Sequence, residues 1–365
     1  MLLDERLLES CGDAIAVRSA LLLLLSLSAA LPHASRAQPA ADADRLTASF
    51  RSEWPDLYAR LIGVERAHGV FYAALARKGK VNEAEVFRLM TGRIAQSASS
   101  SGPDPEADKG YAALGPRAAE IIRRTHEFHR EVLAIFASLD PSNRAHALDA
   151  AVDRYLSRRD VALPDVPKDM TILYDHPYTS FVDEDFTPRR KLTYPSLTGF
   201  VWASHWFQLA AEEPLELLAG SRERLEGVKV VTERFHRKLS SGKPPDAFPT
   251  ELPLAPCISP GLVSAHLRAA AIIDNLNMMH DVLADVLIHP KVGDVRAAID
   301  EVIAQFTDPR SRIVEVDDWI TMALRHSIFQ QGGPALGTMT ANERNTSGHS
   351  QHGRGARAMP PRGME

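Results

Sequence analysis

The chain has 365 residues, of which 45% are hydrophobic and 24% are charged, and its formal net charge at pH 7 is -5. This composition is typical of a globular protein, and with only two cysteines it excludes a disordered chain, a collagen-like repeat and a disulfide-rich scaffold. Nucleic acid is not an expected partner, because a slightly acidic chain lacks the basic surface that binds a phosphate backbone.

The first segment, residues 1–37, has the pattern of a secretory signal peptide. The run ALLLLLSLSAAL at 20–31 forms an apolar h-region, and residues 34–37 form a small-x-small cleavage site. The run is shorter than the roughly 20 residues that cross a bilayer, so cleavage is favoured over a retained membrane anchor at 14–31. Four acids precede the run where a signal needs positive charge, which suggests a natural start near Val17. We therefore expect a periplasmic or secreted protein with no stable membrane span.

The next part of the chain has the three-to-four-residue apolar period of amphipathic helices. This pattern predicts helices at 56–79, 82–96, 116–140 and 143–158, with Asp56 as the N-cap of the first and Pro116 at the first position of the third. A polar linker rich in Ser, Pro and Gly is predicted at 97–108. These elements indicate a helical protein.

Residues 160–195 lack this helical apolar period and contain five prolines and five aromatic residues. The composition predicts an ordered irregular insert with one short strand at 170–174, which either packs on the helices or closes over a ligand.

The second half returns to helices. The apolar segment 196–211 predicts a helix buried on all sides, and further helices are expected at 222–239, 259–289, 294–306 and 317–331. Residues 332–365 contain few apolar residues and are expected to be a disordered tail. The predicted fold is all-α: one bundle-like domain of eight or nine helices within 38–331.

Histidines on apolar helix faces are the main functional candidates. Glu65 and His68 have the E-x-x-H spacing of di-iron bundle proteins, although the second copy that such a site needs is missing. His126 and His129 lie one turn apart; at 100° per residue His129 projects into the apolar arc and His126 to its edge. The alternative for each of these histidines is a purely structural role, in which the imidazole is hydrogen-bonded inside the core.

Three acids on the helix predicted at 259–289 form a second candidate group. Asp274, Asp281 and Asp285 project within about 40° of one another. Because a buried charge needs a partner, these acids must face solvent, pair with arginine or bind a cation, and a solvated or arginine-paired edge is the favoured interpretation.

We hypothesise that imidazoles from separate helices meet in one polar centre, formed by His68, His129, His205, either His266 or His280, and His326. Such a centre would bind iron, copper or zinc through imidazole nitrogen, with carboxylates completing the set. The candidate metal ligands are Glu65, His68, His126, His129, His205, His280, Asp281 and Asp285. A weaker alternative places a copper site in the tail, at His349 and His352 with nearby methionines.

The sequence thus predicts an exported helical protein that binds a small ligand or a protein partner, with a histidine-lined interior site. The competing prediction is a metal-dependent oxidoreductase or metal-handling protein that uses iron or copper. No catalytic residue is assigned, because the sequence contains no phosphate-binding glycine loop, G-x-S-x-G, C-x-x-C or H-E-x-x-H motif.

Overall fold

The computed structural model describes residues 37–77, 81–96, 104–178, 193–240 and 248–337. Within these ranges the chain forms thirteen α-helices, three short 3₁₀ helices and no strand beyond an isolated bridge between Lys168 and Ile313. The all-α prediction is confirmed, whereas the predicted count of eight or nine helices is too low. The expected signal peptide lies outside the described residues, apart from its last position.

The helices follow the chain as α2 (Ala37–Glu53), α3 (Pro55–Leu75), α4 (Glu83–Gln96), α5 (Pro105–Leu114), α6 (Pro116–Ser138), α7 (Pro141–Leu156), η1 (Arg159–Val161), η2 (Met170–Leu173), α8 (Pro195–Ala210), η3 (Glu213–Glu216), α9 (Arg222–Ser240), α10 (Ala255–Ile258), α11 (Pro260–Ala265), α12 (Leu267–Ile288), α13 (Val295–Thr307) and α14 (Val316–Arg325). None of these described helices is both long enough and apolar enough to cross a membrane.

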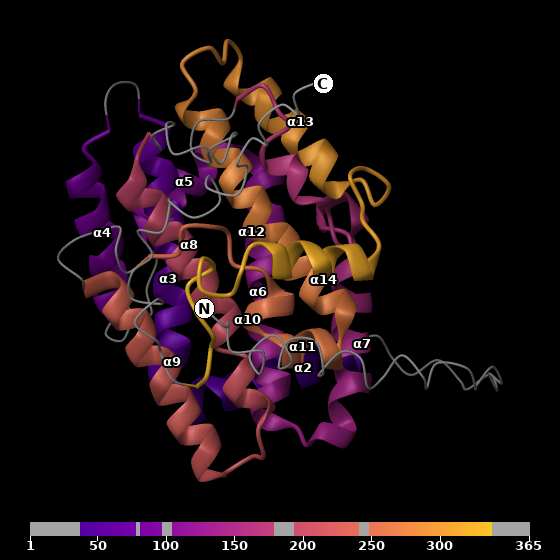
Figure 1. The fold of residues 1–365 in the computed structure, drawn as a ribbon. Coiled ribbons are helices and arrows are strands. Elements are labelled where there is room, and N and C mark those ends of the chain that lie inside the picture. The colour runs from indigo at the N-terminus through magenta and orange to yellow at the C-terminus, as the bar shows by residue number, and fades with distance from the viewer. Residues whose placement is uncertain (1–36, 78–80, 97–103, 179–192, 241–247, 338–365) are drawn as a thin grey trace, which may run out of the picture.

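Four helices from distant parts of the chain meet in the interior: α3, α6, α8 and α12 (Figure 1). Helix α12 contacts both α3 and α6, and α3 also contacts α8. Helix α8 is buried along almost its whole length, as its apolar sequence predicts, and α12 is buried from Ala269 to Val286. The remaining helices pack around these four and complete one hydrophobic core.

Helix α5 packs backbone against backbone on α3. A Cβ atom added at Gly110 would lie 1.7 Å from the carbonyl oxygen of Gly69, and one added at Gly69 would lie 2.6 Å from that of Ala107. Only glycine permits this approach, because any Cβ would overlap the facing main chain. The contact lies next to His68 on α3.

Several boundaries differ from the predictions for local reasons. The long helix expected at 259–289 is divided into α11 and α12, and the short helix α10 precedes it. Pro260 begins α11, and His266 caps α12 because its Nδ1 accepts the Ala269 N–H at 3.1 Å. The end of the expected linker belongs to α5, since the Asp104 side chain caps that helix. The N-cap of α3 is Trp54, and Asp56 lies in its first turn.

The insert also differs from its prediction where it is described. The strand expected at 170–174 is the 3₁₀ helix η2. Asn275 of α12 anchors the preceding residues: its Nδ2 donates to the carbonyls of Pro164 and Val166 at 2.9 Å, and its Oδ1 accepts the Lys168 N–H at 3.2 Å. The beginning of the expected disordered tail is ordered, since Trp206 Nε1 donates to the Gly333 carbonyl at 2.8 Å and Ala335 is 3% exposed.

Two buried arginines join the end of α6 to the turn around η3. Arg224 donates to the carbonyls of Phe136 and Ala137 at 2.8 Å and also to that of Leu215. Arg144 donates to the carbonyl of Phe136 at 3.2 Å. These bonds satisfy the last carbonyls of α6, which no intrahelical N–H can reach.

A buried imidazole cluster as the candidate functional site

Four histidines from the four central helices lie together in the core: His68 on α3, His126 on α6, His205 on α8 and His280 on α12. Their exposed fractions are 0%, 3%, 0% and 1%. The ring centroid of His68 lies 4.7 Å from that of His280, 5.2 Å from that of His205 and 6.3 Å from that of His126. The His280 centroid lies 5.5 Å from each of the other two. We call these four residues the imidazole cluster.

Three members of the cluster have the spacing of a metal site. His68, His126 and His280 each offer one ring nitrogen, and these nitrogens lie within 4.8 Å of one another. In the described part of the chain, no other group of three His, Cys, Asp or Glu side chains meets this condition. In a tetrahedral site with metal–nitrogen bonds of about 2.0 Å, the ligand nitrogens lie about 3.3 Å apart and the ring centroids about 5 Å apart. The three rings therefore need to move toward one another by only about 1 Å to bind a common metal ion.

Within the cluster, His205 is close enough to His280 for a hydrogen bond between the two rings. Its Nε2 lies 3.3 Å from Nδ1 of His280. If Nε2 of His280 binds a metal, the proton of the neutral ring sits on Nδ1 and is donated to His205, whose own proton is then on Nδ1. A hydrogen bond of this kind fixes the tautomer and the orientation of a metal-binding histidine. His205 is therefore placed to orient His280.

Several buried ring nitrogens of the imidazole cluster have no hydrogen-bond partner among the described residues. Both ring nitrogens of His68, Nε2 of His126 and of His280, and Nδ1 of His205 have no hydrogen-bond partner among the described residues. The same holds for both amide atoms of Asn277, one turn before His280. Each unsatisfied buried group costs about 1–3 kcal/mol, so a ligand that engages these atoms recovers that cost.

The electrostatic environment keeps these rings neutral. Burial lowers the pKa of His68 to about 3, and it lowers the pKa of His126, His205 and His280 well below the ordinary value, with the neighbouring imidazoles adding to the effect. A neutral imidazole retains the lone pair that binds a metal. At neutral pH the four rings therefore do not have to lose a proton before they can bind a cation.

Two of the predicted ligands are engaged elsewhere. The Glu65 carboxylate pairs with Arg130, so the E-x-x-H spacing does not bring it to His68. Nε2 of His129 lies 3.1 Å from Oε1 of Glu212, and both residues are buried. Burial raises the pKa of Glu212 well above its usual range and lowers the pKa of His129 to about 4, so burial opposes the charged form of each residue.

The aspartates of α12 are fully buried, which corrects the expectation of a solvated or arginine-paired edge. Asp274 accepts the Ala255 N–H at 3.0 Å and Trp319 Nε1–H at 3.1 Å, and Asp281 accepts Trp202 Nε1–H at 3.2 Å. Asp285 lies 3.3 Å from Nε2 of His176 in the insert. Burial raises the pKa of Asp274 and Asp281 well above their usual range. These acids anchor α12 rather than face water.

The other predicted histidines lie outside the cluster. Nε2 of His266 is 3.0 Å from Asp149, and Nδ1 of His326 is 2.6 Å from Glu251. The tail candidates His349 and His352 lie outside the described residues.

Sequence reasoning missed two residues that contact the candidate ligands. The Tyr72 hydroxyl donates to the His280 carbonyl at 3.1 Å, and Glu212 contacts His129. A tyrosine or an acid within a helical pattern carries no signal of such a contact.

Two surface clefts approach the central helices. The first, which we call the His126 cleft, has a volume of about 580 Å³ between α3, α5 and α6. Its lining consists of Ile62, Glu65, Arg66, Asp104, Ala107, Asp108, Tyr111, Ala112, Pro116, Ala119, Glu120, Ile122, Arg123, His126 and Arg130. A member of the imidazole cluster thus forms part of its wall.

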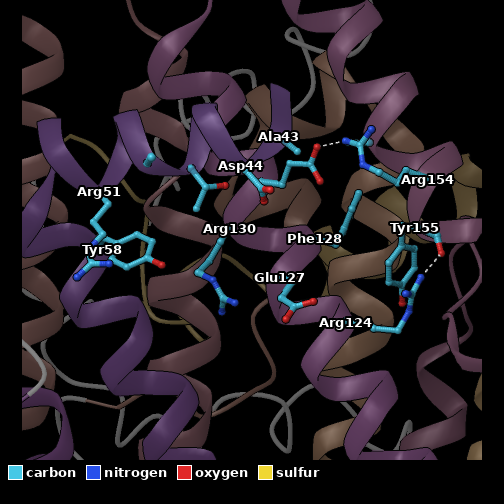
Figure 2. Close-up of a pocket in the computed structure, with 14 residues that line it drawn as sticks. Ala43, Asp44, Arg51, Tyr58, Arg124, Glu127, Phe128, Arg130, Arg154 and Tyr155 are labelled. Atoms are coloured by element: carbon cyan, nitrogen blue, oxygen red, sulfur yellow. Dashed lines mark hydrogen bonds and ion pairs between the residues drawn. The ribbon is translucent and has the colours of Figure 1, made fainter. Parts of the chain in front are cut away.

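The second cleft, the arginine cleft, has a volume of about 620 Å³ and carries Arg51, Arg124, Arg130 and Arg154 between α2, α3, α6 and α7 (Figure 2). Arg154 pairs with Glu131, and Arg124 donates to the Tyr155 carbonyl at 2.7 Å. Arg51 lies 5.9 Å from the centre of the Tyr58 ring. No histidine lines this cleft.

Comparison of the chain with models of protein families, with curated proteins and with solved structures found no match.

Proposed function

We propose that the protein binds one first-row transition-metal ion in the imidazole cluster, with His68, His126 and His280 as ligands and His205 orienting His280. The supporting observation is the approach of three buried ring nitrogens, from helices far apart in the sequence, to within 4.8 Å of one another. Neutral rings and unpartnered nitrogens are two further properties that such a site requires.

The ligand set favours particular metals. Imidazole nitrogen suits zinc, copper and iron, whereas calcium and magnesium prefer oxygen ligands. Three protein ligands leave a coordination position that an exogenous molecule can occupy, which is typical of catalytic sites. The proposal therefore covers metal handling and, with copper or iron, metal-dependent oxidoreduction.

We also propose that the protein is exported, on the support of the apolar run at 20–31 and the small residues that follow it. N-terminal sequencing of the protein isolated from its native host tests this proposal. A mature start at Gln38 is expected, and a chain that begins at Met1 would contradict it.

Metal analysis tests the site itself. The purified protein is stripped with a chelator, incubated with Zn²⁺, Cu²⁺ or Fe²⁺ separately, passed through a desalting column and analysed for metal. We expect one ion per chain for at least one metal, and loss of that ion in His126→Leu and His280→Leu. The matched control is His146→Leu, which removes an exposed imidazole from α7 and should retain the ion.

Circular dichroism establishes that each variant is folded. A wild-type protein that retains no metal, or folded variants at 126 and 280 that retain as much as the wild type, would refute the proposed function.

A further inference from the structure

A buried metal site needs a route along which a hydrated cation arrives, and we infer that the His126 cleft is this route. The inference rests on the proposed function, since it assumes that the imidazole cluster binds the metal. It assigns the cleft to a hydrated divalent cation that reaches the imidazole cluster at His126.

The first argument is that His126 belongs to both features. It lines the His126 cleft, and it contributes one of the three nitrogens of the proposed site. Its exposed fraction of 3% is the largest in the cluster, compared with 0% for His68 and 1% for His280. An ion in this cleft therefore meets the cluster first at His126.

The second argument is that the other walls of the cleft adjoin the remaining ligands. Glu65 lies one turn before His68 on α3, and its main-chain carbonyl accepts a hydrogen bond from the Tyr111 hydroxyl. The Tyr111 ring centroid is 6.2 Å from that of Tyr72, which is in turn 6.1 Å from that of His280. The wall of the cleft at Tyr111 is thus one aromatic ring, Tyr72, away from His280.

The third argument is the charge of the lining. Four acidic residues line the cleft, Glu65, Asp104, Asp108 and Glu120, against three arginines, Arg66, Arg123 and Arg130. Glu65 pairs with Arg130, Asp104 with Arg93 and Glu120 with Arg123, whereas Asp108 adds an exposed carboxylate to the lining. Oxygen ligands stabilise a cation that still holds part of its water shell. The arginine cleft has the opposite balance, with four arginines against Asp44, Glu127 and Glu131, and no member of the cluster lines it.

Obstruction of the cleft tests the route separately from the site. Ala112 is exposed and Ala119 is half-buried, and both line the His126 cleft. We replace them separately, as Ala112→Trp and Ala119→Trp. The control is Ala48→Trp, which places the same bulk at an exposed helical alanine in the arginine cleft. Stopped-flow mixing of each metal-free protein with Co²⁺ follows the d–d absorption of the bound ion.

We expect Co²⁺ association to slow by roughly tenfold or more in the two cleft variants, with an unchanged dissociation constant and with wild-type rates in the control. Wild-type association rates in both folded cleft variants would overturn the assignment of the route while leaving the metal site intact. A wild-type protein that binds no Co²⁺, Zn²⁺, Cu²⁺ or Fe²⁺ would instead refute the proposed function.

Discussion

Replacement of His68 by leucine tests the electrostatics of the cluster directly. The His68 ring is fully buried, and burial lowers its pKa to about 3, against about 6.5 in an unfolded chain. Below pH 6.5 the unfolded chain takes up a proton at this position while the folded protein does not. The lowered pKa therefore reduces the free energy of unfolding as the pH falls from 6.5 toward 3.

The size of this effect follows from the gap between the two pKa values. Each pH unit below 6.5 costs about 1.4 kcal/mol, so at pH 5 the contribution of His68 is about 2 kcal/mol. The buried acids Glu212, Asp274 and Asp281 act in the opposite direction, because their raised pKa values favour the folded state as the pH falls. The effect of His68 is therefore measured as a difference between two proteins.

The assay is urea unfolding of the metal-free wild type and of His68→Leu at pH 7.5, 6 and 5. Between pH 7.5 and pH 5 the wild type should lose about 2 kcal/mol more stability than His68→Leu, because leucine has no proton to gain. The control His146→Leu removes an exposed imidazole. Stability curves for wild type and His68→Leu that run parallel across this range would refute the argument.

Three further predictions concern the metal and the packing. Isothermal titration should give the same metal affinity at pH 7.5 and pH 5.5, because the buried rings are already neutral. Exposed histidine ligands lose about tenfold in affinity per ligand at about one pH unit below 6.5, and a loss of tenfold or more would contradict this prediction. Gly110→Ala should lower the free energy of unfolding by about 3 kcal/mol, because the added Cβ clashes with Gly69. Gly92→Ala, which has no atom within 4 Å of the added Cβ, should instead raise the free energy of unfolding by up to about 1 kcal/mol. Equal urea midpoints for the two variants would contradict this prediction. Arg224→Met should cost about 3 kcal/mol in the same assay because buried carbonyls at the end of α6 lose their donor, and a cost below about 1 kcal/mol would count against that account.

The sequence predicts most helices because apolar period, capping residues and proline positions act locally. These local patterns do not predict which histidines meet in the imidazole cluster. Helical projection places His129 in the apolar arc and His126 at its edge, yet His126 joins the cluster and His129 meets Glu212. Helix α6 contacts α12 on one side and η3 on another, and the periodicity of one helix does not indicate which neighbour covers which part of its buried face.

The aspartates of α12 show the same limit. Their common direction is visible in the sequence, but their partners come from distant segments: Trp319 for Asp274 and Trp202 for Asp281. Nothing local to residues 274–285 distinguishes a buried, hydrogen-bonded carboxyl from an exposed one. Tertiary packing therefore decides the environment of these acids.

The polar anchors of α12 have a consequence for the precision of the site. Asp274, Asn275 and Asp281 bond to different parts of the protein, so a rotation or one-turn slide of the helix would break all three attachments at once. Such anchors select a single register in a helix whose apolar surface would tolerate several. The placement of His280 against its partner rings is thus determined by bonds made up to two turns away, and mutations at those anchors should alter the geometry of the imidazole cluster without removing any of its rings.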